Sequence, residues 1–155
     1  MPHNRYEWID RLKFVAREHR VAATAVERLR VAVLDGQALA PGGTTPRDLV
    51  ATGENLETTY LVRLWAEFET AILSYYRDLR GDPEARIRAA DLVDTLSSVR
   101  RGRRMADALR DEVHEVREHR NSLVHERANP APPVTLVEAR RRLNTFLSKL
   151  PEQWG

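Results

Sequence analysis

Apolar residues recur every three or four positions along most of this chain, which is the repeat of an amphipathic α-helix. Runs that alternate apolar and polar residues between tight turns, which would predict β-strands, are missing. The pattern predicts five helices, over residues 4–34, 54–80, 83–99, 104–128 and 135–150. Helices joined by short connections bury their apolar faces against one another, so we expect an all-α, antiparallel helical bundle.

Local signals set the predicted boundaries of these helices. Gly36 follows the first, Asp82 caps and Pro83 opens the third, and Thr135 with a glutamate three residues later forms a capping box for the fifth. Residues 36–52 are predicted as a long loop, interrupted by a short helical turn at 46–51. The chain shows no internal repeat or second domain, so we interpret all 155 residues as a single domain.

One charged residue departs from the pattern of the fourth predicted helix. An apolar seam with alternating four- and three-residue steps runs along it, through Leu109, Val113, Val116 and Leu123. Arg120 stands on this seam, between its last two members. A charge in such a place is costly unless it is paired or reaches a cavity, so we expect a partner for it.

The second predicted helix contains a matching anomaly. Glu69 falls in the middle of one of its apolar stripes. We expect Glu69 to be buried against Arg120, with Glu57, which is in line with other apolar positions, as the reserve candidate. The alternative is a core ion pair that does no more than fix the register of the two helices.

A polar stripe follows another side of the fourth helix, through His114, Glu118, Asn121 and His125. His125 lies ~140° around a straight helix from Arg120, by five steps of ~100°. Exposed polar stripes are usually only solvated, so a function for this one depends on its sequence context.

Residues 120–125 read Arg-Asn-Ser-Leu-Val-His. This Arg-Asn-x-x-x-His pattern, near the end of a long amphipathic helix, resembles the motif of the HEPN superfamily (higher eukaryotes and prokaryotes nucleotide-binding domain). The resemblance is best over residues 54–128, and residues 64–69, where an acid closes an apolar stretch, are similar to the second helix of many members. It implies a four-helix core, here with an additional C-terminal helix, and a two-fold dimer in which the motif helices face each other. Active members are metal-independent ribonucleases, many of them toxins or antiviral effectors.

Carried over by position, the resemblance implies Arg120 and His125 as the catalytic pair, Asn121 as the accompanying polar residue and Glu69 as the residue that orients Arg120. These residue types suit RNA cleavage, because RNA supplies its own nucleophile, the 2′-hydroxyl. Histidine transfers protons near neutral pH, and arginine forks onto phosphate oxygens as negative charge develops. Since a straight helix separates Arg120 from His125, we favour a site shared across a dimer axis; a long arginine side chain or a distorted helix are the alternatives.

Composition narrows the chemistry further. The chain has no cysteine, which excludes a thiol nucleophile and thiolate metal sites. His114 and Glu118 are four residues apart, but no third ligand accompanies them, so we expect no metal and no cofactor. No apolar run approaches the ~18 residues of a membrane span, and the start of the chain lacks an apolar leader. We therefore expect a cytoplasmic protein that does not enter a membrane.

The net charge is only +2, yet just two of the 25 basic residues are lysines, Lys13 and Lys149. A GC-rich genome would produce this bias without any function, whereas the planar guanidinium group suits phosphate. The candidate RNA contacts are two arginine clusters and one arginine of the motif helix: Arg100, Arg101, Arg103, Arg104, Arg117, Arg140 and Arg141. The second cluster continues to Arg142 and opens the fifth helix, where cations are unfavourable unless an anion lies nearby.

Together these features predict a HEPN-type endoribonuclease that cleaves RNA through the 2′-hydroxyl and forms a homodimer through the motif helix. We expect a toxin or antiviral defence effector, with an antitoxin or another defence protein as its partner. The alternative is a catalytically inactive HEPN-like module that binds a partner protein or a nucleotide.

Overall fold

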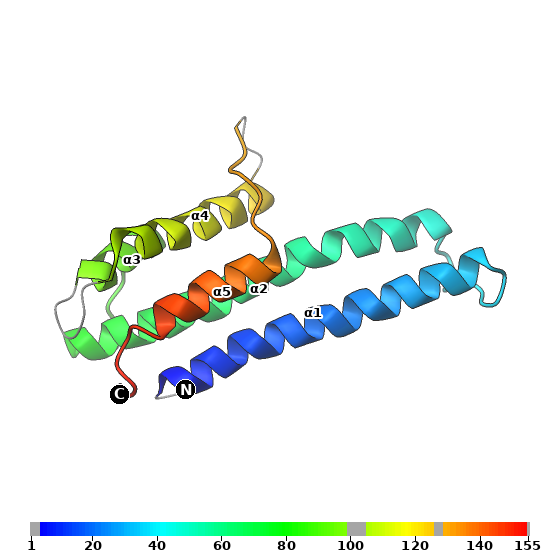
Figure 1. The fold of residues 1–155 in the computed structure, drawn as a ribbon. Coiled ribbons are helices and arrows are strands. Elements are labelled where there is room, and N and C mark those ends of the chain that lie inside the picture. Colours follow the sequence, from blue (N-terminus) through cyan, green and yellow to red (C-terminus); the bar gives the residue numbers. More distant parts are fainter. Residues whose placement is uncertain (1–3, 99–104, 126–128, 155) are drawn as a thin grey trace.

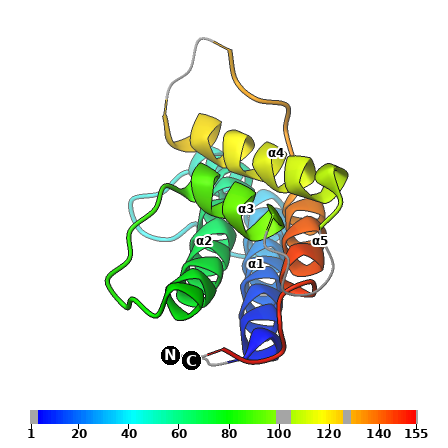
Figure 2. The same ribbon diagram turned by 90° about the vertical axis from the view of Figure 1, so that its left-hand side faces the viewer.

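The computed structural model describes residues 4–98, 105–125 and 129–154, which form five α-helices and no β-strand. The helices are α1 (Arg5–Leu34), α2 (Pro46–Arg80), α3 (Ala89–Ser98), α4 (Asp107–Val124) and α5 (Leu136–Leu147). α1 and α2 form a long antiparallel hairpin, α5 packs on both, and α4 packs on α2, α3 and α5 (Figure 1). The view along the bundle shows α3 and α4 lying across one side of the other three helices (Figure 2). The predicted all-α bundle is therefore confirmed.

α1 begins and ends where the sequence predicts. The side chain of Asn4 accepts a hydrogen bond from the backbone N–H of Glu7 at 2.9 Å, which caps the first turn. At the other end Gly36 has a φ of 70°, a conformation that a residue without a Cβ adopts easily. Both boundaries follow from local side-chain chemistry, which is why the sequence alone predicts them.

α2 is longer than the sequence pattern predicts. The predicted loop over 36–52 is wrong from Pro46 onward, because the helix begins there and continues without interruption. Thr45 and Asp48 form a complete capping box in front of this proline, and together these signals start the helix. Gly53 does not break it: an added Cβ would lie 3.8 Å from a valine of α1, so packing against α1 supports the helix at this point.

α3 is shorter than predicted, since Pro83 does not open it and its first residue is Ala89. A side-chain oxygen of Asp82 accepts a hydrogen bond from the backbone N–H of Glu84 at 2.9 Å. The backbone N–H of Ala85 donates to the carbonyl of Asp82 at 3.2 Å. Asp82 therefore holds a turn here rather than capping a helix, a competing role that aspartate often takes.

α4 and α5 both end earlier than predicted. His125 has a φ of −125° and a ψ of 128°, so the helix ends before it, and the predicted extension over 126–128 lies outside the described residues. α5 starts as predicted, because the Thr135 hydroxyl accepts a hydrogen bond from the backbone N–H of Glu138 at 3.2 Å. It ends at Leu147, three residues before the predicted end.

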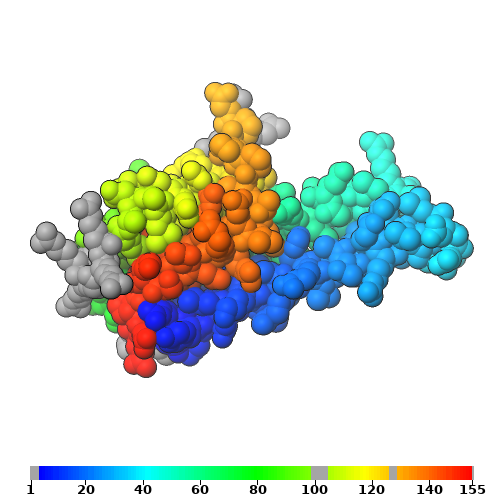
Figure 3. Space-filling model, viewed as in Figure 1, coloured from blue at the N-terminus to red at the C-terminus, as the bar shows by residue number. Residues whose placement is uncertain are grey.

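The core lies where α5 covers the α1–α2 hairpin. Phe68 of α2 is fully buried, and its ring centroid is 5.5 Å from that of Phe146 in α5 and 5.4 Å from that of Trp65. Beyond α5, the second half of α1 and the first half of α2 extend past the other three helices (Figures 1 and 3). The hairpin therefore has one end within the bundle and one end that projects from it.

Candidate functional site

The C-terminal end of α4 carries the residues that the sequence singles out. The apolar seam begins in the core, where Leu109, Val113 and Val116 are buried, and leaves it where Leu123 is only half-buried. Arg120 lies on this last stretch and is itself half-buried. The charge is therefore not fully enclosed in the core.

The Arg120 side chain is held by the next residue. Its Nη1 donates a hydrogen bond to Oδ1 of Asn121 at 3.1 Å. Its Nε is buried and has no hydrogen-bond partner. An unsatisfied buried N–H costs free energy, so a small shift that gave this group an anionic acceptor would be favourable.

Glu69 does not orient Arg120, and that prediction was wrong. The Glu69 carboxylate accepts a hydrogen bond from Nε1 of Trp65 at 2.8 Å, and the described residues contain no ion pair between Glu69 and Arg120. The motif end of α4 instead lies near Glu57, which precedes Glu69 by ~18 Å along α2 at 1.5 Å per residue. Helical periodicity identifies the face on which a residue lies, but not which part of another helix lies opposite it.

His125 is the C-cap residue of α4. Its backbone N–H donates to the carbonyl of Asn121 at 3.0 Å, and its side chain is exposed. Because its backbone is extended, the direction of its side chain no longer follows the helical repeat. The ~140° separation from Arg120 was calculated for a straight helix, so it does not describe this geometry. The structure therefore brings Arg120, Asn121 and His125 to one end of α4.

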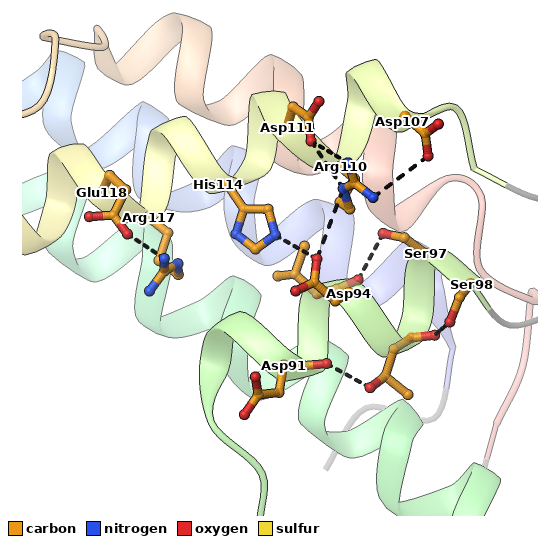
Figure 4. Close-up of polar contacts among 12 residues, drawn as sticks. Asp91, Asp94, Ser97, Ser98, Asp107, Arg110, Asp111, His114, Arg117 and Glu118 are labelled. Atoms are coloured by element: carbon orange, nitrogen blue, oxygen red, sulfur yellow. Dashed lines mark hydrogen bonds and ion pairs between the residues drawn. The ribbon is translucent and has the colours of Figure 1, made fainter.

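The polar stripe of α4 has two different environments. Near its start, Nε2 of His114 lies 2.8 Å from Oδ1 of Asp94 on α3, and Nε of Arg110 lies 3.9 Å from the same oxygen (Figure 4). These contacts tie α4 to α3. At its end, Asn121 and His125 make no side-chain hydrogen bond to another helix within the described ranges. Only this second part of the stripe leaves polar groups for a ligand.

Five of the arginines predicted to contact RNA belong to the 100–104 cluster and to α4. The four of the cluster lie outside the described residues, namely Arg100, Arg101, Arg103 and Arg104. Arg117 of α4 donates a hydrogen bond to Glu118 and forms an ion pair with it. A carboxylate of the same helix therefore already neutralises this guanidinium group.

The 140–142 cluster joins α5 to α4. Arg142 is only 13% exposed, donates to Oε2 of Glu115 at 2.6 Å and lies 3.6 Å from Glu138. Arg141 lies 3.8 Å from Glu112 of α4, and Arg140 is half-buried. The anions that offset these cations near the start of α5 are thus carboxylates of this chain, and RNA contacts by Arg140 and Arg141 stay a prediction.

A titratable pair next to the motif was missed in the sequence. Nδ1 of His119 is buried without a hydrogen-bond partner, and burial lowers the pKa of His119, an effect that the nearby Glu57 carboxylate partly opposes. Oε1 of Glu57 also accepts a hydrogen bond from the backbone N–H of Leu136, the first residue of α5. Glu57 therefore caps α5 beneath α4. The sequence offered one sign that His119 is partly buried: it lies three residues after Val116, on nearly the same side of the helix.

We expect His119 to make the folded protein less stable as the solution becomes acidic. Its pKa lies below the ordinary 6.5 in the folded state, so the unfolded chain binds more protons once the pH falls through 6.5. The stability loss begins at that pH and levels off below the lowered folded pKa. Chemical denaturation at several pH values should show a weaker loss for His119→Gln than for the parent. The exposed His125→Gln is the control for the substitution itself, and equal pH profiles for His119→Gln and the parent would contradict the assignment.

Two further kinds of feature were sought among the described residues: a group of metal ligands and a helix that could cross a membrane. The described ranges contain no group of three His, Asp or Glu residues that could hold a metal ion. They also contain no helix long and apolar enough to cross a membrane. In comparisons with known proteins, no family model, no curated protein and no solved structure matches this chain.

Proposed function

We propose that this protein is a metal-independent endoribonuclease of the HEPN type. One observation carries the proposal: the hydrogen-bonded pair Arg120 and Asn121 and the exposed His125 occupy the same end of α4. These are a guanidinium, an amide and an imidazole, the groups that phosphodiester cleavage by the 2′-hydroxyl requires.

The proposed reaction is an intramolecular transfer at phosphorus. His125 accepts the proton of the 2′-hydroxyl as the 2′-oxygen attacks the adjacent phosphorus atom. The bond to the 5′-oxygen breaks, and this leaving group receives a proton from water, whose hydroxide takes up the proton that His125 accepted. Arg120 donates hydrogen bonds to the non-bridging oxygens as their charge increases, and Asn121 holds the phosphate or the ribose. The products are a 2′,3′-cyclic phosphate and a 5′-hydroxyl end.

In this proposal each site combines His125 of one copy of the chain with Arg120 of a second copy. A two-fold contact through the ends of two α4 helices would place each His125 near the Arg120 of its partner. Apolar surface at this end supports such a contact, since Val124 is 45% exposed and Leu123 is half-buried. RNA cleavage of this kind would halt growth, so the proposal includes a cytoplasmic toxin or antiviral effector that is restrained by an antitoxin or another defence protein.

The test is RNA cleavage by the purified protein in excess EDTA. We expect the parent to produce 2′,3′-cyclic phosphate ends and both His125→Ala and Arg120→Ala to be slower by ~100-fold or more, because each removes a group that acts only in the transition state. The matched controls are His114→Ala, which removes another imidazole of α4, and Arg88→Ala, which removes an exposed guanidinium elsewhere. Equal cleavage by the parent and all four variants would reveal a contaminant and refute the site.

One observation favours a second candidate, a catalytically silent binding module. A cavity of about 800 Å³ lies along the second half of α2, and its lining includes Glu69, Leu73 and Trp154. A largely apolar cavity of this size, with a few polar groups, is typical of small-molecule sites. Absence of RNA cleavage by a protein free of bound partners would favour this alternative.

A further inference from the structure

A stripe of exposed arginines follows the outer face of α1. Arg17, Arg20 and Arg28 are exposed and line a shallow groove of about 470 Å³, together with Val21, Thr24 and Ala25. Counted from Arg17, the other five lie three, four, seven, eight and eleven residues along α1, which places all six on one side of the helix. We call Arg17, Arg20 and Arg28 the basic stripe.

Among the residues that the structure describes, no carboxylate neutralises the positive charge of the basic stripe. None of its three guanidinium groups forms an ion pair within the described ranges. The two acids of α1 nearest to it in the sequence are already engaged: Glu18 forms an ion pair with Arg63 of α2 at 2.7 Å, and Glu27 accepts a hydrogen bond from Arg30 at 2.7 Å. The hydrogen bond from Arg30 also lowers the pKa of Glu27. The contrast is with Arg142, whose charge is offset by carboxylates on α4 and α5.

The basic stripe lies on α1 where the hairpin begins to leave the bundle (Figures 1 and 3). From Arg17 to Arg28 it extends ~17 Å at 1.5 Å per residue, which is enough to contact several successive phosphates rather than one. Next to it Phe14 is 49% exposed, and the guanidinium carbon of Arg17 lies 5.9 Å from its ring centroid. An exposed aromatic ring beside arginines provides a surface on which a base can stack.

We propose that the basic stripe binds the phosphate backbone of single-stranded RNA, with Phe14 stacking on a base. This inference rests on the proposed function in one respect: the RNA held here is the substrate whose cleavage takes place at α4. Guanidinium groups form paired hydrogen bonds with phosphate oxygens, and three unneutralised groups on one helix face match a polyanion.

Two other occupants fit the surface less well. A second copy of the chain would bring like charges together across a two-fold axis. A lipid surface requires a continuous apolar helix face, whereas Val21 and Phe14 alternate here with arginines and Thr24. The phosphate backbone of RNA is negatively charged, so it is attracted by the arginines, and it binds without a continuous apolar face.

The test compares two triple variants in the His125→Ala background, which prevents cleavage during the measurement. One variant is Arg17→Ala/Arg20→Ala/Arg28→Ala; the matched control, Arg80→Ala/Arg86→Ala/Arg88→Ala, removes three other exposed arginines. Binding of a fluorescein-labelled single-stranded RNA is measured by anisotropy over a range of salt concentrations. Each lost phosphate contact reduces the slope of log K against log salt by ~0.7 for single strands. The stripe variant should therefore lose ~2 units of slope and bind roughly 100-fold more weakly at 0.1 M salt.

Several outcomes would overturn the inference. Equal weakening in both triple variants would show that only total charge matters, and unchanged binding by the stripe variant would exclude the surface. Loss of binding to phosphatidylserine vesicles with RNA binding retained would assign the stripe to lipid. If the parent cleaves RNA and the stripe variant binds it normally, the basic stripe is refuted as an RNA site while the proposed nuclease stands. Stripe-dependent binding without cleavage by the parent supports the inference and refutes the nuclease.

Discussion

Mixed dimers of the inactive His125→Ala and Arg120→Ala proteins should recover about a quarter of the parent RNA cleavage. In a site shared across a two-fold axis, Arg120 of one chain acts with His125 of the other. A mixed dimer then contains one complete site and one that lacks both groups. If chains assort at random, about half of the dimers are mixed and each has one of two sites, which gives about a quarter of the parent rate. Against a ~100-fold loss in each separate variant, this recovery is easily measured.

The experiment requires chains that exchange, so the two variants are produced together, and mass spectrometry of differently tagged chains confirms mixed dimers. Mixing His125→Ala with a second His125→Ala preparation is the control and should restore nothing. If mixed dimers are present and cleavage is still absent, each site lies within one chain. A protein that remains monomeric while it cleaves RNA would contradict the shared site directly.

Phe68→Ala should destabilise the protein by about 3–5 kcal/mol, the largest effect expected from a single core substitution here. Phe68 is fully buried between Trp65 and Phe146, so its loss removes two aromatic contacts and leaves a cavity at the junction of α2 and α5. Natural domains are stable by only ~5–15 kcal/mol, so this is a large fraction of the total. Urea denaturation followed by circular dichroism should show a lower midpoint, and the melting temperature should fall by on the order of 10 °C.

The control for this substitution is Phe14→Ala. Phe14 is 49% exposed on α1, so its removal takes little apolar surface out of the core and should change the free energy of unfolding by well under 1 kcal/mol. Similar destabilisation by both substitutions would contradict the placement of the core at the junction of α2 and α5.

Helix boundaries were predictable where the capping side chain has only one favourable local role. Thr135 is an N-cap in the sequence pattern and in the structure, and the first helix begins one residue after its predicted start at Asn4. Asp82 was misread because its carboxylate satisfies a turn as well as it satisfies a helix N-terminus. The start of the second helix was placed too late, because the capping box of Thr45 and Asp48 before a helical stretch that includes Gly53 was not recognised.

The sequence predicted which segment of the chain carries the candidate site, but not which residues of other helices lie next to it. Arg120, Asn121 and His125 are close in sequence, so the structure had only to place them at an open end of α4. The acid on α2 that lies near α4 is far from Arg120 in the sequence, and Glu69 was the wrong choice for it. Which acid meets α4 depends on how far one helix slides along another and on how it is rotated. Glu57 lies ~18 Å along α2 from Glu69, and twelve steps of ~100° also place it on a different face of the helix.

By itself, the sequence determined the helical class, the cap at Thr135, and the group of guanidinium, amide and imidazole at residues 120–125, because these depend on periodicity and neighbours in the chain. Only the tertiary structure decided that Arg141 and Arg142 pair with α4, that Glu57 caps α5, and that three arginines on α1 form no ion pair with another described residue. The reason is physical: whether a charge is paired depends on which helices pack together and in what register. Each helix face permits several such arrangements, and the packing of the whole core selects one.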